Sequence, residues 1–113
     1  MIAPVRNGVA APEAEWISIT DGRFVDDKPQ FSPDGNTLYF TSRRDNHLCI
    51  WAQRLDRITK HPVGAPFAVQ HFHGVQSWRI MDTLHTVQLW VARDKLVTNF
   101  WEFHGDIWMT KLD

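Results

Sequence analysis

Two histidines separated by one residue are the most metal-like feature of this sequence. His71 and His73 fall on the same side of an extended segment, because alternate residues of a strand share a face, and two imidazoles so placed can bind a metal ion. A third ligand cannot be assigned, since the spacing of strong zinc motifs is absent. We therefore expect ordinary polar histidines at the end of a strand, and no bound cofactor.

Adjacent carboxylates form a second candidate site. Asp26 and Asp27 can in principle bind calcium or act as a paired acid and base. Nothing near them in the sequence supplies further oxygen ligands. We expect them instead to cap and solvate the entry to the strand that follows.

The sequence contains no recognisable catalytic apparatus. The Gly-x-Ser-x-Gly elbow of serine hydrolases does not occur, and Ser32 lies in a tight turn where its hydroxyl can bond backbone groups. Cys49 lies inside an apolar run, which favours an inert buried thiol. Arg43 and Arg44 lie in a polar reversal, where we expect them to be solvated. The chain is therefore predicted not to be an enzyme.

Composition and charge exclude further classes. Twelve Lys and Arg residues against thirteen Asp and Glu residues give a formal net charge of −1, so no overall positive field attracts nucleic acid or an anionic membrane. No stretch approaches the ~20 apolar residues of a membrane span, and the N-terminus lacks the apolar core of a signal peptide. A single cysteine can form no internal disulfide, which leaves the compartment open. We expect neither nucleic-acid nor membrane partners.

The elements that must position these residues are short β-strands. Runs of β-branched and aromatic residues bounded by turn residues predict one strand over 16–20 and four more within 27–72. A Ser-Pro-Asp-Gly turn at 32–35 joins the first two of the four, with its glycine at positive φ. The run 48–55 is apolar on both faces at its start, so it must be covered on both sides. After a proline-containing loop over 56–66, the last strand completes an antiparallel meander.

An internal repeat organises the chain. Residues 50–56 and 107–113 share Ile, Trp, Leu and Asp at matching positions, and strand-like runs precede the second copy as they precede the first. The sequence therefore predicts an N-terminal arm over 1–13 and a unit of about two blades over 14–113. Four strands per repeat are typical of β-propeller blades. The blade over 27–72 is complete and the one over 86–113 is incomplete.

The stretch 27–42, with its Ser-Pro-Asp-Gly turn, and its continuation to Ile50-Trp51 and Leu55-Asp56 resemble the WD40-like repeat of TolB-type propellers. The terminal stretch 105–113 is similar to the closing end of large bacterial propeller proteins. The second copy departs from the pattern because it lacks Ser-Pro-Asp-Gly. The resemblance implies an all-β fold of four-stranded antiparallel blades, about two in this chain, in a family that typically has six.

Two blades alone would expose larger apolar faces than a soluble monomer usually shows. The resemblance therefore implies missing blades, supplied either by a longer parent protein or by further copies of the chain. We favour a homo-oligomer, in which three copies give a ring of six blades.

Three classes of function are compatible with this architecture. The leading one is a non-catalytic scaffold or protein-binding module. The alternative is an accessory or enzyme-related propeller with a ligand or metal site at the central channel, where residues of the inner strand would converge. The candidates for that site are Asp26, Asp27, Lys28 and Gln30. In the third class the chain is an isolated fragment without independent function.

Overall fold

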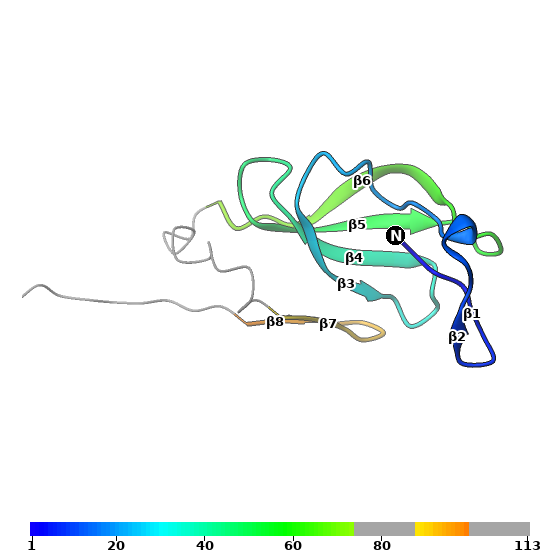
Figure 1. Ribbon diagram of the computed structural model, residues 1–113. Coiled ribbons are helices and arrows are strands. Elements are labelled where there is room, and N and C mark those ends of the chain that lie inside the picture. Colours follow the sequence, from blue (N-terminus) through cyan, green and yellow to red (C-terminus); the bar gives the residue numbers. More distant parts are fainter. Residues whose placement is uncertain (74–87, 100–113) are drawn as a thin grey trace, which may run out of the picture.

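A computed structural model of the chain describes residues 1–73 and 88–99 (Figure 1). Its main element is a four-stranded antiparallel sheet in which the strands follow one another in sequence order. These strands are β3 (Asp26–Phe31), β4 (Thr37–Ser42), β5 (Cys49–Leu55) and β6 (Pro62–Gln70). The predicted all-β class and the antiparallel meander are confirmed.

β5 is an interior strand because its sequence is apolar on both faces. It pairs with β4 from Cys49 opposite Ser42 to Arg54 opposite Thr37, and with β6 on its other side. Cys49 and Ala52 are fully buried and Ile50 is 1% exposed. The expectation that this strand is covered on both sides is confirmed, and its start forms the best-buried part of the described chain.

The Ser-Pro-Asp-Gly turn between β3 and β4 has the predicted geometry. Gly35 has a φ of 69° and donates its N–H to the carbonyl of Ser32 at 2.8 Å. The Ser32 hydroxyl accepts the Thr37 N–H at 3.0 Å, and the Asp34 carboxylate accepts the Asn36 N–H at 3.0 Å. The serine therefore satisfies backbone groups, as expected, and the turn fixes the start of β4.

The loop expected over 56–66 is shorter than predicted, because β6 already begins at Pro62. The reversal is held by Asp56, whose carboxylate accepts the N–H groups of Ile58 and Thr59 at 2.9 and 2.7 Å. Proline is tolerated in β6 because this strand lies at the edge of the sheet. Gly64 has a φ of 70° and lies where the pairing with β5 shifts its register. Residues 62–66, which the sequence predicts to be part of the loop, therefore belong to an irregular edge strand.

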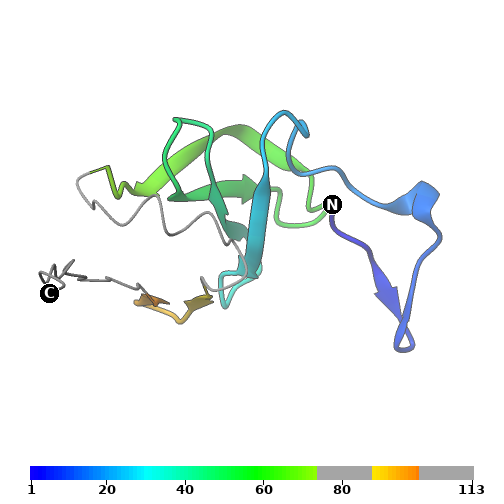
Figure 2. The same cartoon turned by 60° about the vertical axis from the view of Figure 1, so that its left-hand side comes forward.

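The N-terminal residues fold rather than form a plain arm. A hairpin of β1 (Val5–Arg6) and β2 (Val9–Ala10) projects away from the sheet and is followed by the short 3-10 helix η1 (Glu13–Glu15) (Figure 2). The strand expected over 16–20 is reduced to one bridge between Ile17 and Ile2. This segment packs on the sheet without extending it, since Ile19 lies in one buried cluster with Leu38 and Leu55.

Of the residues predicted to form a second, incomplete blade, those that the structure describes form a two-stranded hairpin beside β3 (Figure 1). It consists of β7 (Leu89–Val91) and β8 (Leu96–Thr98), which fall within the runs 87–92 and 95–100 that the sequence predicts to be strands. Leu89 is 2% exposed, so the hairpin is anchored by its first residue. The repeat motif at 107–113 lies outside the described residues.

Candidate metal centre

Four residues that can bind a metal ion meet at one end of the sheet. Asp45 lies in the β4–β5 turn, Cys49 begins β5, and His71 and His73 follow the end of β6. In an antiparallel meander the end of one strand, the start of the next and the end of the third all lie at the same end of the sheet. The topology therefore brings together residues that are far apart in the sequence.

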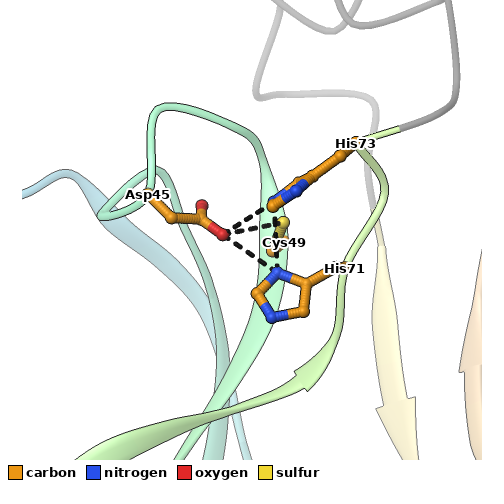
Figure 3. Close-up of side chains that lie close together, drawn as sticks. All are labelled: Asp45, Cys49, His71 and His73. Atoms are coloured by element: carbon orange, nitrogen blue, oxygen red, sulfur yellow. Dashed lines mark hydrogen bonds and ion pairs between the residues drawn. The ribbon is translucent and has the colours of Figure 1, made fainter.

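The ligand atoms converge on one Asp45 oxygen (Figure 3). Asp45 Oδ2 lies 2.9 Å from His71 Nδ1 and 2.8 Å from His73 Nε2, and these two nitrogens are 3.1 Å apart. Cys49 Sγ is 3.7 Å from the same oxygen. The four ligand atoms all lie within 4.8 Å of one another.

The electrostatics of the group are set by burial and by hydrogen bonds. Burial acts to raise the pKa of the Asp45 carboxyl, but hydrogen bonds from His73 and from the His47 backbone N–H outweigh it and hold that pKa below its usual value. Burial raises the pKa of the Cys49 thiol, and the neighbouring Asp45 charge adds to the effect. The carboxylate is thus stabilised as an anion, whereas the thiol keeps its proton unless a cation lies beside it.

Two aromatic contacts orient the histidine rings. The His47 ring lies against His73 with ring centroids 4.2 Å apart, and Trp51 meets His71 edge-on at 6.1 Å. The His47 backbone also holds the second Asp45 oxygen, Oδ1, at 3.4 Å. Of these neighbours, the His47 N–H is the kind of hydrogen-bond donor that orients a carboxylate ligand.

Thiolate, imidazole and carboxylate together form a donor set typical of zinc. His71 and His73 were identified in the sequence, although we expected them to be ordinary polar residues. Asp45 and Cys49 were missed, because both ligands lie more than twenty residues upstream. The meander itself was the signal that could have found them, since it predicts that the β4–β5 turn lies beside the end of β6.

The residues proposed for a channel site, Asp26, Asp27, Lys28 and Gln30, all lie on β3. Asp26 pairs with Arg44, and Asp27 holds the Lys28 N–H at 2.8 Å and its Nζ at 3.7 Å. Lys28 has a φ of 52°, in a register shift that interrupts the pairing with β4. Gln30 is exposed beyond this irregularity.

Arg44 is not the solvated residue expected from its place in a polar reversal. Its side chain is 12% exposed and donates from Nη2 to both Asp26 oxygens, at 3.0 and 3.1 Å. Its guanidinium also lies between 5.2 and 5.3 Å from the ring centroids of Phe24, Phe40 and Trp51. The aromatic surroundings, which no local sequence pattern reveals, draw this charge into the sheet.

Comparisons with protein-family models, with curated proteins and with solved structures give no match for this chain. We therefore infer its function from the contacts described above. No helix in residues 1–73 and 88–99 is long and apolar enough to cross a membrane.

Proposed function

We propose that this chain is a non-catalytic binding module, a WD40-like propeller blade of the TolB type that associates with further copies of itself. The observation that carries the proposal is the apolar surface that the described sheet leaves exposed. A module of this kind presents a rigid sheet and its connecting turns to a partner, without chemistry of its own.

Exposed apolar side chains lie on both outer strands of the meander. Phe31 on β3 is 45% exposed, and on β6 Val63 is 52% exposed and Phe67 and Val69 are 40% exposed each. The β7–β8 hairpin adds Trp90 at 52% and Val97 at 54%. Large apolar side chains exposed on both outer strands and on the hairpin are available for contact with a partner.

The edges of the sheet support the same proposal. Within the described residues, β3 pairs only with β4 and β6 pairs only with β5. The prolines and register shifts of β6 limit pairing with another strand, so its exposed apolar side chains, and not its backbone groups, are what a partner would cover. Packing against neighbouring blades buries such side chains and stabilises the assembly.

The substitution of β6 residues tests this proposal. We expect Phe67→Lys to shift the sedimentation coefficient of the purified chain toward a lighter species, because a charge on β6 opposes burial of the strand. Ile58→Lys is the matched control, since Ile58 is 89% exposed in the β5–β6 turn, outside the sheet. A chelator in the buffer removes any association through metal ions. Equal sedimentation of Phe67→Lys and wild type would contradict the proposal.

A further inference from the structure

We propose that Asp45, Cys49, His71 and His73 bind one zinc ion, which ties the β4–β5 turn to the segment after β6. This site is separate from the proposed function, which rests on exposed apolar residues elsewhere on the sheet. Its four ligands are also different residues from those of β3 considered for a channel site.

The spacing of the four ligand atoms fits a tetrahedral ion. Zinc bonds of about 2.0–2.3 Å place neighbouring ligand atoms about 3.3–3.8 Å apart. The measured separations between Asp45 Oδ2 and the other three ligand atoms run from 2.8 to 3.7 Å. His71 and His73 lie closer to Asp45 Oδ2 than the ligands of one zinc ion do, so both imidazoles must move outward by about half an ångström to admit the ion.

Hydrogen bonds alone do not explain this arrangement well. His71 Nδ1 and His73 Nε2 face each other at 3.1 Å while both face the same Asp45 oxygen. If both nitrogens carry protons toward the oxygen, two donors crowd together, and if one does not, its lone pair faces a carboxylate. A cation between the three atoms removes this conflict, because nitrogen and oxygen lone pairs then all point to positive charge.

Cys49 and the two histidines differ in their exposure to solvent. Cys49 is fully buried, while the His71 and His73 side chains are 49% and 46% exposed. The thiol therefore forms the floor of the site and the two imidazoles its rim, which gives an ion a path from solvent.

Four protein ligands make a closed site. A catalytic zinc keeps one position open for water or substrate, whereas a structural zinc is held by four protein side chains. The ion proposed here is therefore structural. It links the β4–β5 turn to the segment after β6, which are far apart in the sequence and adjacent in the meander. Binding of the ion releases the thiol proton of Cys49.

Cobalt titration of the full, metal-stripped chain tests the proposal. Co²⁺ takes the same ligands as zinc, and a thiolate–cobalt bond gives a charge-transfer absorption in the near ultraviolet together with d–d bands in the visible. We expect both signals to saturate at one ion per chain, and Zn²⁺ to displace them.

The exposed ligands give the cleanest variants. His71→Gln and His73→Gln should each weaken Co²⁺ binding by about 100-fold or more, beyond the effect of losing a residue that only supports a ligand. His61→Gln is the matched control, because His61 is an exposed histidine beside the opposite end of β6. Cys49→Ser should abolish the charge-transfer absorption, and circular dichroism shows whether this buried variant folds.

Absence of the thiolate–cobalt absorption in the wild-type chain would overturn the proposal. So would unchanged binding in both His71→Gln and His73→Gln, or an equal loss in His61→Gln. These outcomes are independent of the sedimentation experiment, which is performed without metal.

Discussion

At the residue scale, polar side chains decide how the buried part of the sheet is held. Gln53 is 1% exposed, and its amide nitrogen lies 2.9 Å from the Arg54 carbonyl oxygen, 3.1 Å from that of Val63 and 3.2 Å from that of Gly64. These carbonyls lie where the pairing of β5 with β6 shifts its register, between Ala52 and Arg54. The buried amide of Gln53 therefore has backbone acceptors on both strands, as a buried polar side chain requires.

Replacement of this glutamine should be costly. We expect Gln53→Ala to lower the free energy of unfolding by about 1–3 kcal/mol, because buried carbonyl groups lose their donor. Gln30→Ala, at an exposed position of β3, should change it by less than about 0.5 kcal/mol. Urea unfolding of both variants checks the difference, and equal values would mean that these hydrogen bonds do not stabilise the sheet.

The Arg44–Asp26 pair is the second buried polar contact, with side chains 12% and 13% exposed. Arg44→Met should cost about 3–5 kcal/mol, because it leaves the Asp26 carboxylate without its partner in a poorly solvated place. The double variant with Asp26→Asn should recover part of this loss. Chemical denaturation of the single and double variants measures the coupling, and purely additive losses would show that the pair does not interact.

At the element scale, strands were predicted well where the turns beside them are held by contacts between residues close in sequence. The Ser-Pro-Asp-Gly turn was predicted in detail because all its contacts lie within a few residues. The start of β6 and the strand expected over 16–20 were not. Pro62 is tolerated only at a sheet edge, and among the described residues Ile17 makes a single β-bridge, to Ile2. Long-range placement also decided the site: His71 and His73 were visible in the sequence, but Asp45 and Cys49 joined them only through the meander.

The turn between β3 and β4 depends on its glycine. Gly35→Ala should lower the free energy of unfolding by about 1–2 kcal/mol, because its φ of 69° is unfavourable for a residue with a Cβ atom. Gly35→Asn should cost less, since asparagine adopts this conformation more readily. Thermal unfolding of the two variants tests the assignment, which fails if alanine is tolerated as well as asparagine.

The proposed zinc ion links the β4–β5 turn to the end of β6, so it should also stabilise the fold. Free zinc at 1,000 times its dissociation constant should add about 4 kcal/mol, because the ion binds the folded chain and not the unfolded one. We expect the melting temperature to rise with zinc and to fall again with a chelator. His71→Gln should remove this response, and an identical rise in that variant would place the stabilising ion elsewhere.

At the scale of the whole molecule, the proposed self-association depends on apolar surface that a single copy leaves exposed. The described sheet has a well-buried interior strand, but its outer strands and the β7–β8 hairpin expose Phe31, Phe67, Trp90 and other apolar residues. The fold class follows from the sequence pattern because strand periodicity and turn residues are local. The number of copies does not, since it depends on how these surfaces fit one another.

The absolute mass of the purified chain in solution, measured by light scattering over a range of concentrations, tests the proposed function most directly. We expect a sharp species of several chains of 13.2 kDa, with three copies favoured. A well-behaved monomer at every concentration would contradict it, because the exposed apolar residues of β6 and the hairpin would then be stable in water without a partner copy.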